Sequence, residues 1–267
     1  MNRWVLVTGG GQRLGREICL AFAQGGWNVA CHYLNSEAEA RTVVAQAQSL
    51  GVRAVAVRGA LDAAADAEEL FRTTTGCIEG PLHCVVNNAS AFVPDTAAGF
   101  DPAALLQRLQ TNLVAPLVLA RLLHGQAAAQ GLEDGAAAAI HILDQKVFNL
   151  NPDYFSYTLS KLALERAVAQ QAQALAPVLR VCAVAPGLLY PSGPQSLDNF
   201  AAAAQANLLR RPIAPAAVAQ SVRFLAENRC ITGVSVCVDN GQHLVALPRD
   251  IMFVVDELLA KLAHEKP

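Results

Sequence analysis

Two side chains that can move a proton, Tyr157 and Lys161, stand four positions apart in the segment YTLSK. Residues with this spacing share one face of a helix, where the ammonium can lower the pKa of the phenol and hold the ribose of a cofactor. Asp144 stands 13 positions before the tyrosine, at the end of the apolar run AAAAIHILD. A Tyr-x-x-x-Lys pair is common by chance, so a predicted proton-transfer site depends on the motifs that accompany it.

A glycine-rich loop near the start of the chain offers a place for a phosphate. In TGGGQRLG, residues 8–15, Gly9, Gly11 and Gly15 permit a tight turn and let backbone N–H groups approach a pyrophosphate at a helix N-terminus. Arg13 stands where such loops usually have a small residue. By itself the motif is also compatible with a plain turn between a strand and a helix.

Polar residues also follow the apolar start of the segment VVNNASAF and lie within the segment TNLVAP. Asn87 and Asn88 are compatible with an ordinary strand end, but that interpretation leaves the aromatic Phe92 without a role. Asn112 lies within an apolar helical stretch, where a buried amide must find partners. It is therefore either a structural hydrogen-bond hub or a residue that holds a water molecule.

These motifs lie between short strand-like runs and longer helical runs. Strand patterns cover residues 4–9, 27–33, 53–59, 82–90, 136–144, 179–187 and 233–241, and helical patterns cover 16–26, 36–50, 66–75, 101–131, 157–176 and 215–227. Apolar strands separated by helices predict right-handed crossovers and a parallel sheet covered on both faces. We predict a single α/β domain over residues 1–267, with a Rossmann-like, doubly wound sheet of about seven strands. The loops after the first, fourth, fifth and sixth strands should carry the chemistry.

In this order and spacing, the motifs resemble those of the short-chain dehydrogenase/reductase family. The matching set runs to about Leu244 and comprises TGxxxxxG, the NNA strand end, the Asn of NLVAP, YxxxK and the PG of VAPGLL. The resemblance implies that Tyr157 is the proton donor, that Lys161 positions the nicotinamide ribose and tunes the phenol, and that Asn112 holds a water in a proton relay. It also implies hydride transfer from a bound dinucleotide.

Two departures separate this chain from most of that family. One is Arg13, and the other is Asp144, which replaces a serine that hydrogen-bonds the substrate carbonyl. A serine can donate to a developing oxyanion, whereas an ionised aspartate only accepts and repels that charge. Asp144 therefore disfavours a ketone and favours a substrate that offers N–H groups or a ring nitrogen to be protonated.

A pteridine, with a 2-amino-4-oxo ring and reducible C=N bonds, meets this description. Arg13, the Ser90 and Phe92 of NASAF, and the Asp-Tyr-Lys set resemble the pteridine reductases and the bacterial dihydromonapterin reductases. In that branch the pterin stacks between the nicotinamide and an aromatic ring, here Phe92. Arg13 is then expected to bind the pyrophosphate and reach the substrate ring. The alternative is a solvent-facing arginine at a helix start.

The loop after the second strand predicts NADP(H) in preference to NAD. NAD-dependent members usually have an acidic residue at that strand end, and CHYLNSEAEA has none there. His32 and Ser36 match the HYxxS pattern of NADP-using pteridine reductases. Asn35 replaces an arginine that would hold the 2′-phosphate, so we expect weaker binding.

Near the adenine, Ala60 replaces an aspartate found in many members, Leu61 is expected to cover the ring, and Asp62 is expected to cap a helix. The predicted cofactor-binding residues are Gly9, Gly11, Arg13, Leu14, Gly15, His32, Tyr33, Asn35, Ser36, Ala60, Leu61, Asn88, Ala89, Ser90, Tyr157, Lys161, Pro186, Gly187 and Leu188. The predicted substrate-binding residues are Arg13, Ser90, Phe92, Asp144, Tyr157, Leu188 and Tyr190.

Two segments in the C-terminal third of the chain fall outside the motifs described so far. Residues 188–212 are rich in Pro and Gly and are expected to form a lid over the substrate, with Leu188, Leu189 and Tyr190 as pocket walls. Residues 245–267 extend past the usual end of the fold. Their helical stripe consists of Ile251, Val254, Val255, Leu258, Leu259 and Leu262, and it must pack on a neighbouring subunit or on its own subunit.

Composition excludes several classes of protein. A net charge of −2 without clustered Lys or Arg argues against nucleic-acid binding, and no apolar run is long enough to span a bilayer. We predict no signal peptide and no metal site, and we interpret the seven cysteines as buried, reduced thiols of a cytoplasmic protein. The family resemblance implies a homotetramer.

Three functions are compatible with these residues. The first is an NADPH-dependent reductase of a pterin C=N bond. The second is a short-chain reductase with an unrelated carbonyl or imine substrate, and the third is a catalytically inactive dinucleotide-binding sensor. The complete set of Asn112, Tyr157 and Lys161 argues against the third.

Overall fold

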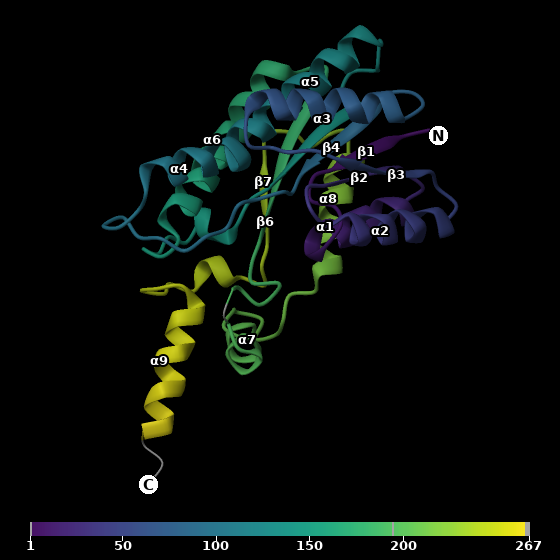
Figure 1. Ribbon diagram of the computed structural model, residues 1–267. Coiled ribbons are helices and arrows are strands. Elements are labelled where there is room, and N and C mark those ends of the chain that lie inside the picture. Colours follow the sequence, from purple (N-terminus) through teal and green to yellow (C-terminus); the bar gives the residue numbers. More distant parts are fainter. Residues whose placement is uncertain (1, 194, 265–267) are drawn as a thin grey trace.

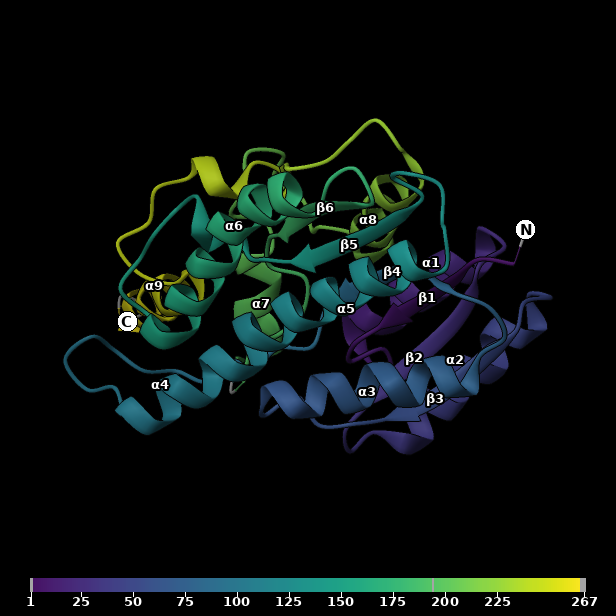
Figure 2. The ribbon, with the colours of Figure 1, turned by 90° about the horizontal axis from the view of Figure 1, so that it is seen from above.

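The chain forms one parallel sheet with helices on both faces, as the alternation of strand and helix patterns predicts. In the computed structural model, which describes residues 2–193 and 195–264, the strands are β1 (Trp4–Val7), β2 (Asn28–Tyr33), β3 (Ala54–Arg58), β4 (Leu82–Asn87), β5 (Ala137–Ile142), β6 (Leu179–Pro186) and β7 (Ser235–Val238). Their order is β3-β2-β1-β4-β5-β6-β7, and all neighbouring pairs are parallel (Figures 1 and 2). The doubly wound fold is confirmed.

Six long helices form the two outer layers. On one face lie α1 (Arg13–Gln24), α2 (Glu37–Ser49) and α8 (Pro215–Glu227), and on the other lie α3 (Ala64–Cys77), α5 (Ala115–Ala129) and α6 (Phe155–Leu175). Figure 1 shows α3 and α5 across the sheet from α1 and α2. Because successive strand residues point to opposite faces, β1 sends Val5 and Val7 to the first layer and Trp4 and Leu6 to the second.

The predicted helix over residues 101–131 is interrupted. It consists of α4 (Pro102–Leu109), a π-helical turn (Gln110–Val114) and α5. The turn contains the buried Asn112, whose hydrogen bonds to neighbouring loops are described below. Single π-turns inside α-helices are frequent at functional sites, and an apolar periodicity does not reveal them.

The expectation that Asp62 caps α3 is wrong. The carboxylate of Asp66 accepts from the backbone N–H groups of Asp62 and Ala63, at 3.0 and 2.9 Å. A carboxylate in the first turn can reach back to these amides and complement the helix dipole at the same time.

The late segment adds two helices that contact each other. A short helix, α7 (Leu197–Ala203), lies within the predicted lid region, and α9 (Ile251–His264) packs on it (Figure 1). Ile251 and Val255 form an apolar cluster with Ala203 and the half-buried Leu188. The described side chains at the start of this stripe therefore pack on their own subunit. The side chains of Leu258, Leu259 and Leu262 lie outside the described residues.

One feature of the fold places ligands. The strand order reverses between β1 and β4, which opens a crevice beyond the carboxyl ends of these strands. Within residues 2–193 and 195–264, none of the helices is long and apolar enough to cross a membrane.

Candidate active site

A cavity of about 1020 Å³ lies beyond the carboxyl ends of the strands. Most of the predicted residues line it, namely Gly9, Arg13, Leu14, Gly15, His32, Tyr33, Asn35, Ser36, Leu61, Asn88, Ala89, Ser90, Phe92, Asp144, Tyr157, Lys161, Pro186, Gly187, Leu188 and Tyr190. Gly11, Ala60 and Asn112 lie outside its lining. Its size suits an extended ligand together with a second small molecule.

The glycine loop forms the floor of one end. Gly9 has a φ of +61°, and a Cβ on Gly15 would collide with the Gly9 carbonyl oxygen, so neither position accommodates another residue without strain. Gln12, at the N-cap of α1, makes no side-chain cap, which leaves first-turn N–H groups available to an anion. Gly11 instead permits close packing against Ser36.

His32 supports this loop from below. Its Nδ1 accepts from the Gly9 N–H at 3.0 Å, and its Nε2 donates to the Gly59 carbonyl at 3.2 Å. Burial lowers the pKa of His32 to about 4, so the ring is neutral at pH 7. A neutral, buried ring positions the loop backbone and carries no charge toward a 2′-phosphate.

The strand end NNA ties β4 to the glycine loop. The Asn88 side chain donates to the Thr8 carbonyl at 2.9 Å, and the Thr8 hydroxyl accepts from the backbone N–H groups of Asn88 and Ala89. The amides at this strand end therefore hold the two strands that border the crevice.

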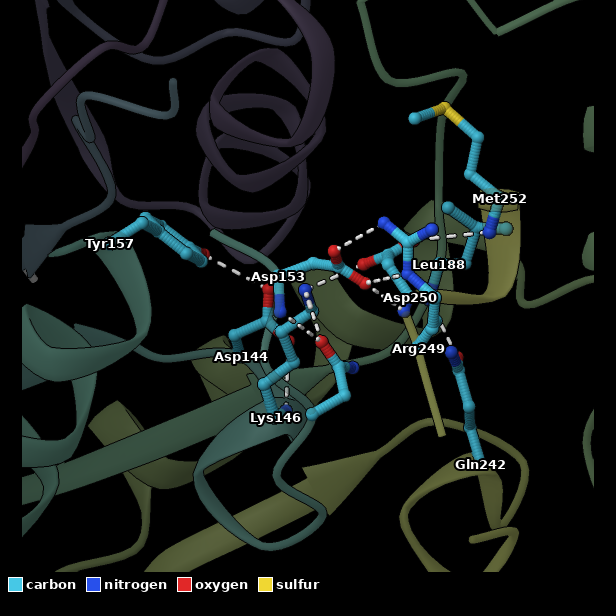
Figure 3. Close-up of polar contacts among 10 residues, drawn as sticks. Asp144, Lys146, Asp153, Tyr157, Leu188, Gln242, Arg249, Asp250 and Met252 are labelled. Carbon is cyan, nitrogen blue, oxygen red and sulfur yellow. Dashed lines mark hydrogen bonds and ion pairs between the residues drawn. The ribbon is translucent and has the colours of Figure 1, made fainter. Parts of the chain in front are cut away.

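Tyr157 and Asp144 meet in the cavity, although α6 and β5 supply them separately. The Tyr157 hydroxyl donates to Asp144 Oδ2 at 3.0 Å (Figure 3). The start of α6 is held in place by Asp95, which accepts from the Ser156 N–H at 3.0 Å and pairs with the buried Arg108 at 2.9 Å. Tyr157 is only 6% exposed.

The predicted lowering of the phenol pKa is wrong for this arrangement. Burial raises the pKa of Tyr157 well above its ordinary value, and the adjacent Asp144 carboxylate raises it further. Lys161 donates instead to the Ile142 carbonyl at 2.7 Å, and burial lowers its own pKa to about 8. Tyr157 is thus held protonated, as a proton donor must be.

Asn112 has the contacts of a hydrogen-bond hub. Its Oδ1 accepts from the Ala91 N–H at 2.8 Å, and its amide donates to the Ala91 carbonyl and to Ser160 Oγ, both at 3.0 Å. Ser90 also donates to Oδ1 at 3.3 Å. These bonds attach the loop after β4 to α6, while the role of Asn112 in a proton relay stays a prediction.

Aromatic rings form the wall beside Tyr157. Phe92, 39% exposed, stacks on Tyr154 with ring centroids 4.3 Å apart and meets the Tyr157 ring edge-on at 4.6 Å. Tyr154 begins α6 with φ 57° and ψ 50°, a left-handed conformation that costs an L-residue free energy and is concentrated at functional sites. No pattern in the sequence singles out Tyr154, although it lies three positions before Tyr157.

Arg13 contacts the lid region. Its guanidinium donates to the Pro191 carbonyl at 2.7 Å and lies 5.1 Å from the Tyr190 ring centroid. Arg13 itself has a φ of 49°. Arg13 is exposed, and its guanidinium joins the glycine loop to residues 190–191. Its contacts with a pyrophosphate and with a substrate ring stay predictions.

Further cavity residues come from segments whose role the sequence did not indicate. The Gln242 side chain accepts from the Leu188 N–H at 2.9 Å, and Lys146, Asp250 and Ile251 line the cavity beyond Asp144 (Figure 3). Asp250 precedes a helical stripe, which is the pattern of an N-cap. No local signal places that cap in the cavity.

The chain was compared with known proteins. A family described as enoyl-(acyl carrier protein) reductase matches residues 11–243. This chain belongs to the short-chain dehydrogenase/reductase family. It is accordingly an NAD(P)-dependent oxidoreductase by family, as the motifs predict.

Individual relatives cover nearly the whole chain. A dihydromonapterin reductase of Citrobacter koseri is 28% identical over 254 residues, which cover 90% of this chain and 96% of the relative. The crystal structure of FolM alternative dihydrofolate reductase 1 from Brucella canis, complexed with NADP, is 36% identical with a TM-score of 0.85, over 91% of this chain and 94% of that one. The angucycline C-6 ketoreductase LanV with bound NADP is 25% identical with a TM-score of 0.81, over 91% and 96%.

Proposed function

We propose that this protein is an NADPH-dependent reductase that transfers hydride to a C=N bond of a dihydropterin. The observation that carries the proposal is the hydrogen bond from Tyr157 to Asp144, which puts an acceptor where most of the family has a donor. The relatives named for dihydromonapterin and dihydrofolate reduction support the same substrate class.

The electrostatics of the site support Tyr157 as the proton donor. The raised pKa of Tyr157, caused by burial and by Asp144, keeps the phenol protonated until a substrate nitrogen takes the proton. A carbonyl oxygen that gains negative charge at this place would meet the Asp144 carboxylate. A pterin instead presents N–H groups to that carboxylate and a ring nitrogen to the phenol.

The dinucleotide end fits an extended, anionic cofactor. The uncapped start of α1 and the Gly9–Gly15 contact form a backbone cradle that a Cβ would fill. The buried Lys161 lines the same cavity, with its Nζ 5.8 Å from the centroid of the Tyr157 ring. NADPH, when bound, supplies the hydride. NADP in the FolM structures from Brucella supports this choice over NAD.

A flat ring also fits the aromatic wall. Phe92 and Tyr154 stack within 4.3 Å of each other, and Phe92 exposes part of its ring at the cavity lining. We propose that Phe92 covers the face of the pterin that points away from the nicotinamide.

A ketone or imine reductase is the second candidate. The observation that favours it is the similarity to LanV, a ketoreductase that covers nearly the same share of this chain. An inactive dinucleotide-binding sensor is less compatible with the cavity, because Tyr157, Asp144 and Lys161 all line it.

The experiment that tests the proposal is a substrate panel followed by NADPH oxidation. Dihydromonapterin, dihydrobiopterin and dihydrofolate are compared with aromatic and aliphatic ketones, and each is repeated with NADH. We expect turnover of at least one pterin with NADPH. Turnover of ketones but of no pterin would overturn the proposal, and turnover of neither would favour the sensor.

The family resemblance also predicts a homotetramer. Sedimentation velocity of the purified chain measures that state directly.

A further inference from the structure

A buried ion pair lines the cavity beyond Asp144. Lys146 Nζ lies 2.6 Å from Asp250 Oδ2, and the two side chains are 5% and 15% exposed. The Lys146 backbone N–H donates to Asp144 Oδ1 at 2.9 Å, so the pair is directly adjacent to the proton-transfer residues. Figure 3 shows Asp250, which precedes α9, as a neighbour of Asp144 and Lys146.

The main chain around Asp250 is held firmly. The Asp250 N–H donates to Asp153 Oδ2 at 2.8 Å, and Arg249 pairs with Asp153 Oδ1 at 2.8 Å. Asp250 Oδ1 accepts from the Met252 N–H at 3.1 Å, as an N-cap of α9 does. One carboxylate oxygen thus serves the helix, while the other faces Lys146.

A capping role alone does not explain the second oxygen. An N-cap aspartate at a helix start is normally solvated, and burying an ion pair costs free energy unless both ions are fully satisfied. Among residues 2–193 and 195–264, the other contacts of the Lys146 ammonium group are long: Asn151 Oδ1 lies at 3.5 Å and the centroid of the Tyr154 ring at 4.6 Å. The pair therefore keeps one donor and one acceptor position for a ligand.

We infer that Asp250 is a specificity-determining residue that selects a neutral, hydroxyl-bearing side chain on the reduced pterin. This inference rests on the proposed function. With the reactive ring beside Tyr157, the substituent extends past Asp144 toward the pair. Hydroxyl groups can donate to Asp250 and accept from Lys146, as the dihydromonapterin side chain can.

The same pair discriminates against substituents that lack hydroxyl groups. Dihydrofolate carries a methylene, an amine and a benzoyl ring next to its pterin, and its carboxylates lie at the far end of that substituent. It would cover the buried pair without equivalent hydroxyl partners, and a site that hydrogen-bonds a substrate hydroxyl rejects an analogue that lacks it.

The test compares dihydromonapterin with dihydrofolate in the full chain. Asp250→Asn keeps the shape and the helix cap, since asparagine is an equally good N-cap, but removes the charge. Glu257→Gln is the matched control, because it removes one carboxylate from the same helix at a side chain that is 60% exposed.

We expect Asp250→Asn to lower the ratio of kcat/KM for dihydromonapterin to kcat/KM for dihydrofolate by about tenfold or more, the effect of one charge-assisted hydrogen bond. The change should appear in KM, because the contact is the same in the ground and transition states. Glu257→Gln should leave the ratio unchanged.

Two results separate the possible failures. If the wild type reduces both pterins and Asp250→Asn alters only the melting temperature, Asp250 is a structural cap and this inference is overturned while the proposed function stands. If the wild type reduces neither pterin, the proposed function itself fails. An equal change of the ratio in Glu257→Gln would also overturn the inference, since a general charge effect would then explain it.

Discussion

The two ends of the cavity are built in different ways. The dinucleotide end uses backbone groups and short-range packing, with Gly9, Gly15 and the neutral His32 all coming from the first βαβ unit, β1 to β2. The proton-transfer end uses side chains. There, Asp144 and Lys146 come from the segment after β5, Tyr157 comes from α6, and Asp250 comes from the residue before α9.

The two kinds of construction suit two kinds of ligand, one shared by many enzymes and one particular to this protein. A backbone cradle recognises a pyrophosphate, which every dinucleotide carries, so its geometry tolerates little change. Under the proposed function, the charged side chains at the other end recognise the substrate, and they come from segments outside the strands. Arg13 joins the dinucleotide end to the predicted lid region, because it donates to the Pro191 carbonyl.

The largest effect should come from the proton-transfer end. Tyr157→Phe removes the proton donor and should reduce turnover by about a hundred- to ten-thousand-fold, the usual range for a general acid. NADPH affinity, measured by fluorescence titration, should stay within about twofold, because the other end of the cavity is untouched. Unchanged turnover would remove Tyr157 from its proposed role, and a parallel loss of NADPH binding would show that the two ends are not separable.

Two buried histidines, His32 and His141, should make the protein less stable in acid. Burial lowers the pKa of His32 and of His141 to about 4, so the unfolded chain takes up their protons first as the pH falls. The free energy of unfolding should therefore be constant above about pH 6.5 and should fall as the pH drops toward 4. The loss should amount to about 3 kcal/mol for each ring.

Urea unfolding as a function of pH measures this loss. His141→Gln should remove about half of the pH dependence that the two histidines cause, even if it lowers stability at every pH. A free energy of unfolding that is constant between about pH 6.5 and 4 would contradict the predicted titration.

The dinucleotide end should tolerate even one added methyl group poorly. Gly15→Ala puts a Cβ against the Gly9 carbonyl oxygen, and moving the loop should weaken NADPH binding by about tenfold or more. Gly125→Ala in α5 is the matched control, because nothing lies within 4 Å of its Cβ. It should stabilise the fold by about 0.5 to 1 kcal/mol. Equal NADPH affinity in both variants would show that the cradle adapts.

The smallest effect concerns cofactor choice. Asn35 lines the cavity and is exposed, while the nearby Glu39 carboxylate accepts from Gln12 at 2.9 Å. Asn35→Arg adds a partner for a 2′-phosphate and should tighten NADPH binding several-fold, because one exposed charge-assisted contact contributes about that much. NADH binding should not become tighter. Calorimetric titration with both cofactors measures the difference, and an equal gain for NADH would place Asn35 away from the phosphate.

Much of the cavity was predictable because its motifs have short-range causes. Strand and helix periodicity predicted the doubly wound sheet, and the strand-end rule placed the glycine loop, Asn88, Asp144 and Pro186 at one edge. The pKa direction of Tyr157 was not predictable from the Lys161 spacing. It depends on burial and on Asp144, neither of which a spacing of four residues contains.

The sequence by itself determined the fold, the dinucleotide loop and the Tyr-Lys pair, since each follows from residue periodicity or from contacts within one βα unit. Three contacts are visible only in the folded chain: Arg13 with Pro191, the start of α9 with α7, and Asp250 with Lys146. These contacts join segments far apart in the chain. Their partners are set by how helices and loops pack around the end of the sheet, and no local pattern encodes that packing.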